Sequence, residues 1–348
     1  MSVLTRMYRG ETHFDFVAIS KKALLVSLAL VIGSILIMIF KPFNLSIDFT
    51  GGVIVSAQNQ SGVTVEEVRA DLRELGYADA RVQITGEDFV LVQTEALNPD
   101  QQDELVLTVA TVSGDDVNEV NVDAVGPTFG AEVTRKAIEA LVVFLIVVSF
   151  FIAWRFEWKM AGAALAALFH DLIIAGGIYA LVGFVVTPST IIAVLTILGY
   201  SLYDTVVVFD KVTENVHEAS SRTTYSSIIN DSMNQVLMRS INTSFTSLLP
   251  VGVLLFVGFA SIGAETLLQF ALALFIGIAI GTYSSLFVAS PLLGIWKERE
   301  PEWERRRRRS ERTDDEPVDS PKAAPTSVEA GTSVIPTARP PKQRRKRR

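Results

Sequence analysis

Long apolar runs, separated by short polar stretches, make up most of this chain. The first run follows two lysines near the N-terminus, and a longer, more polar segment comes after it. Five further runs follow that segment. The six runs cover residues 23–40, 136–154, 160–184, 189–210, 239–260 and 266–293. Each is long enough for a helix to cross a bilayer, so the pattern predicts six membrane-spanning helices.

The polar segment, residues 41–134, has the alternation and the turn residues of a folded domain. Its first β-rich stretch, IDFTGGVIVSAQ, predicts a strand in which Gly51 and Gly52 allow a bulge or a close backbone approach. VTVEEVRADLREL predicts a helix, because Thr64 and Glu67 have the spacing of a capping box.

After this helix, the segment predicts two strands, a second helix and a last strand. The strands, ARVQITG and DFVLVQTEA, are joined by a turn at Gly86-Glu87, and Pro99 opens the second helix. VNEVNVDAVG alternates as a last strand. The order β-α-β-β-α-β is typical of the ferredoxin-like fold. We therefore predict an α-helical multi-pass membrane protein of six transmembrane helices, with a small α+β ferredoxin-like extracytoplasmic domain between helices 1 and 2.

The basic residues between the apolar runs predict the orientation. They stand before the first run, between the second and third, and after the sixth, whereas segment 41–134 is strongly acidic. By the positive-inside rule, residues 1–22 and the C-terminus are cytoplasmic. The acidic domain surface could meet a cationic partner, but a solvated surface is the expectation. Residues 211–238 are expected to form a polar, amphipathic inner loop.

The last residues, 297–348, are rich in proline, serine and arginine and end in QRRKRR. They cannot bury a core and are predicted to be disordered, which leaves 136–296 as a five-helix bundle. A basic tail could bind anionic lipid or RNA, yet a solvated orientation signal is the better interpretation, so no specific nucleic acid is expected.

Composition excludes several kinds of chemistry. The 348 residues include no cysteine, which rules out disulfides and thiol chemistry. No GxxxxGK[ST] loop occurs, so energy would come from an ion gradient or a partner. We expect neither an enzyme nor a cofactor.

Asp204 is the most informative residue, because it stands inside an apolar run that ends at Asp210. Tyr200 and Ser201 lie four and three residues before it, on the same helix face. Ionisable groups in membrane helices usually face the bundle interior or a water path. The functional interpretation is a group that binds a proton or another ion, and the alternative is a carboxylate held permanently in an ion pair between helices.

Three further features are predicted at membrane depth. One is a polar helix stripe that must face protein or water, namely Arg239, Asn242, Thr243, Thr246 and Pro250. If Arg239 approaches Asp204, it favours the ionised acid. Another is His170-Asp171, for which a hydrogen bond between helices is expected rather than a metal site. The third is a row of small residues that allows close helix packing, Ala273, Gly277 and Gly281.

Five ordered segments of this chain resemble the SecF family of bacterial protein-export subunits, over roughly residues 10–296. They are IDFTGG, VGPTFGAEVTRKAI, GYSLYDTVVVFDKVTEN, NQVLMRSINTSFTSLLP and FALALFIGIAIGTYSSLFVASPLL. Asp204 and Arg239 match the proton-pathway residues of that family. The family usually has asparagine where this chain has Tyr203, which puts the role of that asparagine in doubt here.

The resemblance implies a subunit that pairs with SecD, associates with the SecYEG channel and acts after SecA, with YajC as a further candidate partner. It would use the proton-motive force to help pull preproteins across the bacterial cytoplasmic membrane. Whether Asp171 joins the proton path stays open. Two alternatives also remain: a scaffold for SecD and SecYEG that conducts no protons, and a half-sized exporter of lipids or drugs of the RND superfamily.

Overall fold

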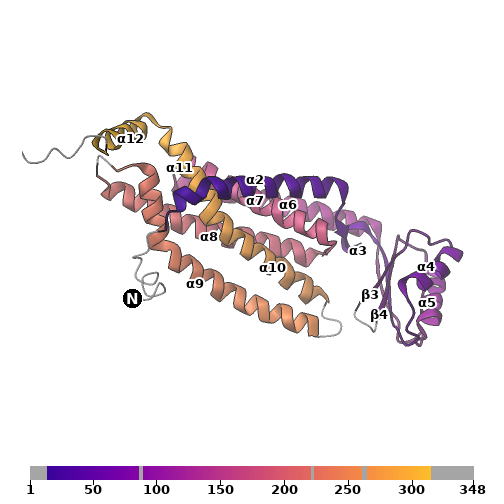
Figure 1. The fold of residues 1–348 in the computed structure, drawn as a ribbon. Coiled ribbons are helices and arrows are strands. Elements are labelled where there is room, and N and C mark those ends of the chain that lie inside the picture. The colour runs from indigo at the N-terminus through magenta and orange to yellow at the C-terminus, as the bar shows by residue number, and fades with distance from the viewer. Residues whose placement is uncertain (1–13, 86–88, 221–222, 261–264, 315–348) are drawn as a thin grey trace, which may run out of the picture.

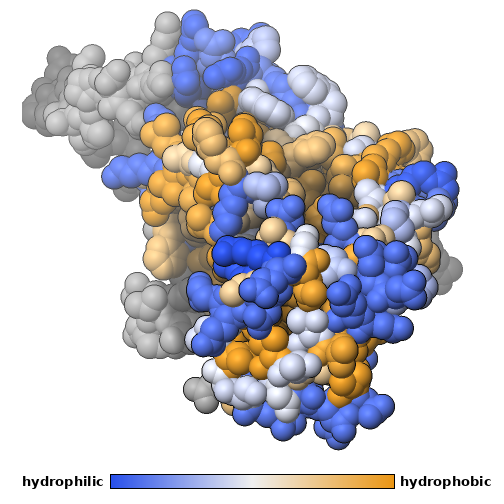
Figure 2. Space-filling model, turned by 90° about the vertical axis from the view of Figure 1, so that its right-hand side faces the viewer, coloured by the Kyte–Doolittle hydropathy of each residue, from blue (hydrophilic) through white to orange (hydrophobic). Residues whose placement is uncertain are grey.

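A computed structural model describes residues 14–85, 89–220, 223–260 and 265–314 of the chain. A bundle of long helices carries a small sheet domain at one end, and helix α12 lies at the other end (Figure 1). The sheet-domain end presents many hydrophilic residues, with apolar patches between them and along the neighbouring bundle (Figure 2).

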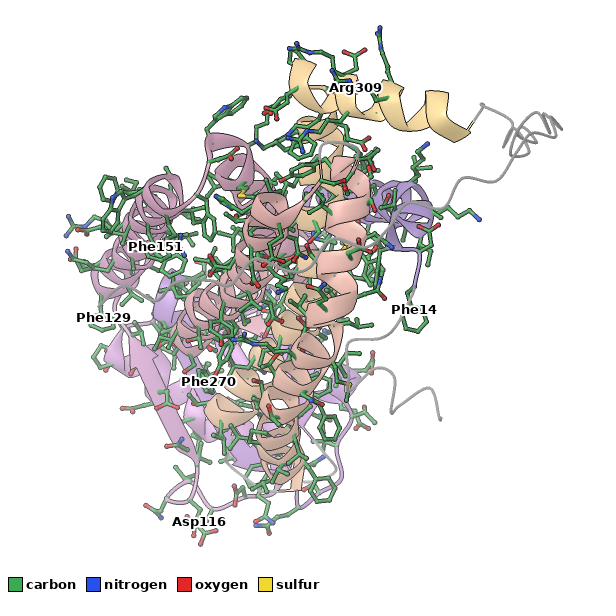
Figure 3. The ribbon with its side chains drawn as sticks, turned by 90° about the vertical axis from the view of Figure 1, so that its left-hand side faces the viewer. Phe14, Asp116, Phe129, Phe151, Phe270 and Arg309 are labelled. Atoms are coloured by element: carbon green, nitrogen blue, oxygen red, sulfur yellow. The ribbon has the colours of Figure 1, made fainter. Side chains whose placement is uncertain are left out.

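Six helices of the described residues are long and apolar enough to cross a membrane, as the sequence predicts. The bundle consists of α2 (Phe16–Phe40), α6 (Pro127–Arg155), α7 (Trp158–Val182), α8 (Pro188–Glu218), α9 (Tyr225–Ala260) and a last span divided into α10 (Glu265–Ser284), the π-helix η1 (Ser285–Ala289) and α11 (Ser290–Glu298). Helix α10 packs against both α8 and α9, and α2 packs against α7. Phe129 and Phe151 on α6 point outward at the edge of the bundle (Figure 3).

The helices extend beyond the apolar runs, and the expected inner loop over 211–238 is wrong. Helix α8 continues to Glu218, and α9 begins at Tyr225. Polar residues continue α8, for example through the ion pair between Lys211 and Glu214, while Val212 is buried in the bundle core. The first turns of α9 bury one apolar face in the bundle core through Tyr225, Ile228, Ile229 and Met233, so amphipathic spacing extended the helix where overall polarity suggested a loop.

The sheet domain contains β2 (Gly52–Gln58), α4 (Val65–Glu74), β3 (Arg81–Thr85), β4 (Phe89–Thr94), α5 (Pro99–Ser113) and β5 (Asn121–Val125). The strand order is β3-β4-β2-β5, and every neighbouring pair is antiparallel. One face of the sheet packs against both helices. This core includes Val53, Val55, Val68, Leu72, Val90, Val92 and Leu105.

The two helices of this domain begin at side-chain caps. Thr64 and Glu67 form the predicted capping box at the start of α4. Pro99 opens α5 as predicted, and Asn98 with Gln101 forms a second capping box there. These caps satisfy backbone N–H groups that the first helical turn leaves unpaired.

The IDFTGG segment differs from the predicted strand in its first half. Residues Ile47–Thr50 form the short helix α3, and the strand begins only at Gly52. The Ser46 hydroxyl donates to Asp48 and backbone bonds close the turn, which ends at Gly51 with a φ of 73°. A Cβ at Gly51 would lie 2.8 Å from Pro127 Cα, so this glycine lets the domain meet the start of α6.

Two short strands pair with each other near the domain, one after α2 and one between α7 and α8. Strand β1 (Asn44–Leu45) pairs in parallel with β6 (Val185–Val186), a pairing that the sequence did not predict. The predicted turn at Gly86-Glu87 and most of the turn from Ser261 to Glu265 lie outside the described residues.

The expectation of disorder after residue 297 is wrong for its first part. Helix α11 ends at Glu298, and α12 (Pro301–Asp314) follows. Trp303 on α12 is buried and packs edge-on against Tyr225, which anchors this charged helix to the bundle. The remainder of the tail, from residue 315, lies outside the described residues.

Candidate functional site

A cavity of about 150 Å³ lies in the bundle between α8, α9 and α10. Its lining is Tyr200, Ser201, Tyr203, Asp204, Thr243, Ser244, Thr246, Ser247, Ile278 and Thr282. Nine of these ten side chains carry a hydroxyl or a carboxylate. The cavity is partly open to the surface of the chain, and its volume has room for several water molecules.

Asp204 is the acid of this cavity. Only 9% of its surface is exposed. Its Oδ1 accepts a long hydrogen bond of 3.4 Å from the Thr243 hydroxyl, which also faces backbone carbonyls of its own helix. Ser201, one helical turn earlier on α8, lines the same cavity. The carboxylate therefore has a weak fixed partner and space beside it, as an exchangeable proton requires.

Arg239 contacts the neighbour of Asp204. One of its guanidinium nitrogens donates to the Tyr203 hydroxyl at 3.0 Å. Among the described residues, Arg239 has no ion pair with Asp204 within 4.0 Å. The Tyr203 hydroxyl thus binds the arginine, and Asp204 forms no salt bridge with it in this structure.

The rest of the polar stripe on α9 divides into two groups. Thr243 and Thr246 line the cavity. Arg239, Asn242 and Pro250 are exposed on the surface of the chain, as Thr246 also is in part. The stripe therefore faces the cavity along one edge and the outside of this subunit along the other.

His170 and Asp171 lie deeper in the bundle, 6% and 2% exposed. The His170 Nδ1 and the Asp171 Oδ1 are 3.0 Å apart. The Asp171 Oδ2 accepts hydrogen bonds from Ser201 at 2.5 Å and from Ser284 at 2.8 Å. The expected hydrogen bond between helices is thus present and joins α7, α8 and α10.

Asp210 does not belong to the cavity. It forms an exposed ion pair with Arg155 at 2.9 Å, with about half of each side chain accessible. Such surface pairs contribute little to stability. Asp210 therefore serves as a natural control for Asp204, because both carboxylates are on α8.

The small residues of α10 bring it close to α8. Ala273 is buried, a Cβ at Gly277 would overlap the Ile197 side chain, and one at Gly281 would lie 2.9 Å from the Ser201 Cβ. The predicted close packing therefore occurs within this chain. It also fixes the distance between the helices that carry Asp204 and Ser284.

Several polar contacts of the site were not singled out from the sequence. Thr282 donates to Ser244 at 2.8 Å, and Thr205 and Ser285 are hydrogen-bonded at 3.0 Å. Ser285 begins the π-helical segment η1, and such segments often occur at functional sites. Within the described residues, no group of three or more His, Cys, Asp or Glu side chains could hold a metal ion.

Comparisons with known families agree with this layout. Residues 106–299 match the family "Protein export membrane protein SecD/SecF, C-terminal", and residues 36–58 match the "SecD/SecF GG Motif". The second match includes Gly51 and Gly52, which have positive φ angles. The structure thus gives a physical role to the glycine pair, at the junction between the sheet domain and the bundle.

Curated relatives and solved structures point to the same family. The protein translocase subunit SecF of Streptomyces coelicolor is 40% identical over 299 residues, which cover 85% of this chain and 80% of that protein. The SecF of Mycobacterium tuberculosis is 40% identical over 310 residues, covering 86% and 70%.

A solved structure of a SecD/SecF protein has a similar fold. The crystal structure of SecDF from Thermus thermophilus, a translocon-associated membrane protein, superposes with a TM-score of 0.74 at 35% identity over 83% of this chain. This chain spans 39% of that longer protein. Sequence and fold agree, and the chain belongs to the SecD/SecF family of protein-export membrane proteins, as a SecF-type translocase subunit.

Proposed function

We propose that this chain couples the proton-motive force to protein export, with Asp204 as the group that binds and releases the proton. The observation that carries the proposal is a nearly buried carboxylate beside a polar cavity, without a salt bridge to hold it. One charge that crosses a potential of 100 mV releases about 2.3 kcal/mol, so a single exchanging carboxylate can transmit useful work.

The geometry favours this function over a scaffold that conducts no protons. A scaffold would hold Asp204 in a lasting pair with Arg239, whereas Arg239 donates to Tyr203. The guanidinium is therefore positioned next to the acid without neutralising it. When Asp204 loses its proton, Arg239 can leave Tyr203 and approach the new charge, and this exchange of partners would move α9 relative to α8.

A SecD subunit is the proposed partner within the membrane. Arg239, Asn242 and Thr246 of α9 and Tyr200 and Tyr203 of α8 are exposed on the surface of this chain. Polar groups at this depth cannot remain against lipid. The SecDF structure combines both names in one chain longer than this one, which supports a second subunit on this face.

The sheet domain is proposed to be a ferredoxin-like domain outside the cytoplasm that holds the emerging preprotein. The element order β2-α4-β3-β4-α5-β5 and the sheet order β3-β4-β2-β5 support this assignment. The basic residues at the opposite end of the bundle support a cytoplasmic location of both termini, in a bacterium. SecYEG, SecA and YajC are the proposed associates at the channel.

Preprotein export into inverted membrane vesicles that contain this chain and SecD tests the proposal. Arg239→Met should abolish the stimulation of export by a proton gradient, while export driven by SecA and ATP continues. Arg155→Met is the matched control, because Arg155 lies away from the cavity, in an exposed ion pair with Asp210 and over the Phe156 ring. Equal stimulation in both variants at equal abundance of the complex would refute the proposed role of this site.

A further inference from the structure

A second buried acid lies next to the Asp204 cavity, and Ser201 connects the two. Ser201 lines the cavity with one side and donates a 2.5 Å hydrogen bond to Asp171 with its hydroxyl. Ser201 and Asp204 are three residues apart on α8, so their side chains lie about 5–6 Å apart at the Cβ atoms. One water molecule in the cavity can bridge this distance.

The surroundings of Asp171 hold a titratable pair rather than a simple structural acid. Its carboxylate receives two hydroxyl donors, from Ser201 and Ser284, on one oxygen and faces His170 Nδ1 with the other. The other His170 nitrogen, Nε2, is buried and has no hydrogen-bond partner. An unpaired buried ring nitrogen is costly, so this imidazole is not fully satisfied by its contact with Asp171.

The remaining titratable groups near the pair come from the helices packed around it. From α10, the Tyr283 ring stacks on His170 at 6.3 Å, and the Tyr283 hydroxyl lies 3.0 Å from Ser27 of α2. From α8 the nearest acid is Asp204, and from α9 the nearest cation is Arg239, which is bonded to Tyr203. Among the described residues, His170 is thus the only basic side chain in direct contact with Asp171.

We propose that Asp171 and His170 form a second proton-binding site in series with Asp204, with Ser201 as the relay between them. The inference rests on the proposed proton coupling and adds a second station to it. The proposed ligand is a proton rather than a metal ion, because both hydroxyls donate to the carboxylate and, among the described residues, no group of three or more His, Cys, Asp or Glu side chains could hold a metal ion.

The transfer balances as a hydroxyl relay. The Asp204 O–H bond breaks, and its proton passes to a water molecule in the cavity. That water gives a proton to Ser201 Oγ, while the original Ser201 hydroxyl proton moves along the short hydrogen bond to Asp171 Oδ2. Asp204 ends as a carboxylate, the Asp171–His170 pair has gained one proton, and Ser201 and the water are unchanged.

The π-helical segment connects this site to helix movement. Ser284 donates to Asp171, and the next residue, Ser285, donates to the backbone carbonyl of Ser201 at 3.1 Å. Ser284 directly precedes η1, and Ser285 is its first residue. The wider turn of this π-helix points consecutive side chains into the bundle. A proton on Asp171 weakens the acceptor for Ser284 and Ser201 together, so α8 and α10 respond to the same event.

Proton uptake by vesicles that contain the full chain with SecD and a trapped pH dye, under an imposed membrane potential, tests the relay. Ser201→Ala should slow uptake about tenfold or more, as expected for loss of a positioned proton-transfer group. Ser284→Ala removes the other donor to the same Asp171 oxygen but does not line the cavity, so its loss should be clearly smaller. A purely structural role of these hydroxyls predicts equal losses, and that result would overturn the relay.

Infrared difference spectra between high and low pH provide a second readout that needs no activity. The inference predicts two protonated carboxyl bands. One should be absent in Asp204→Asn, and the other should be shifted in Ser201→Ala. The Ser201→Ala variant replaces Asp171→Asn as the test of the second band if Asp171→Asn does not fold. A single band that disappears in Asp204→Asn overturns the second site and leaves the proposed function intact. If the unaltered protein takes up no protons at all, both proposals fail.

Discussion

Asp204 and Asp171 belong to the same bundle but have different surroundings. Asp204 has one long hydrogen bond and a cavity beside it, whereas Asp171 has two short hydroxyl donors and a histidine. The first carboxylate therefore lies beside space for water, whereas the second is held in place by donors from two neighbouring helices.

Some side-chain positions in this site follow from sequence patterns, and others do not. Asp204, Thr243 and the small residues of α10 were predictable, because periodicity places them on polar or close-packed faces. The partner of Arg239 was not, because two acceptors, Tyr203 and Asp204, are adjacent on α8. Only the length and direction of the side chains decide between them. The contact between His170 and Asp171 likewise depends on rotamers that helix periodicity does not determine.

Gly277 tests the close approach of α8 and α10. Gly277→Leu should destabilise the protein by about 1–3 kcal/mol or more, the usual cost of overpacking, because Ile197 occupies the space. Gly199→Leu is the control, since a Cβ at Gly199 meets nothing within 4 Å. Thermal unfolding in detergent should show a lower midpoint only for the first variant, and equal midpoints would contradict this packing.

At the scale of elements, a cluster at the end of the bundle opposite the sheet domain anchors α12. Lys297 is buried and forms ion pairs with Glu157 and Glu300, and Lys159 also pairs with Glu300. Partial burial raises the pKa of the Glu300 carboxyl, but the hydrogen bond from Lys159 and the charge of Lys297 outweigh it and hold the pKa below its ordinary value. Glu300 therefore stays ionised at neutral pH and keeps the cluster together.

Trp303 is the apolar part of this anchor. Trp303→Ala should release α12 from the bundle, because truncating a buried aromatic costs about 3–5 kcal/mol and its contact with Tyr225 is lost. Limited trypsin digestion should then cut quickly within Arg305 to Arg309. Trp154→Ala, which alters a side chain that is 80% exposed, should leave the digestion rate unchanged, and similar rates for both variants would refute this docking.

The loop prediction failed, whereas the order of strands and helices predicted for residues 52–125 is observed. The strands and caps of the sheet domain carry local signals, such as Thr64 with Glu67, that act within a few residues. Residues 211–238 were expected to form a polar, amphipathic loop, although Ile228, Ile229 and Met233 repeat at helical spacing and are buried. For α3, a local hydrogen bond from Ser46 to Asp48 outweighed the β propensity of the segment.

At the scale of the whole molecule, the glycines of IDFTGG and of α6 join the domain to the bundle. A Cβ at Gly130 would lie 2.7 Å from the Gly51 nitrogen, and Thr134 donates to the Phe49 carbonyl. The domain is thus fixed to the start of α6 by backbone contact. Movement of the bundle helices can therefore be transmitted to the domain, which a flexible tether would not allow.

Reporter fusions test the orientation of the whole chain. A reporter that is active only outside the cytoplasm should work after residue 100, in the sheet domain, and fail after residues 157, 220 and 320. The reason is that basic residues lie beside residue 157 and after the sixth apolar run, and the alternation of spans puts residue 220 on the same side. Activity after residue 220, between α8 and α9, would contradict the proposed topology.

The comparison of two aspartates on α8 tests the central claim most directly. In vesicles with SecD, export of a preprotein is measured with the proton gradient intact and then collapsed by an uncoupler, at equal abundance of the complex. Asp204→Asn keeps the size of the side chain but cannot titrate, so its export should no longer respond to the uncoupler. Asp210→Asn, which alters an exposed ion pair, should respond as the unaltered protein does. If the Asp204→Asn protein still loses export when the gradient is collapsed, Asp204 does not couple proton movement to export.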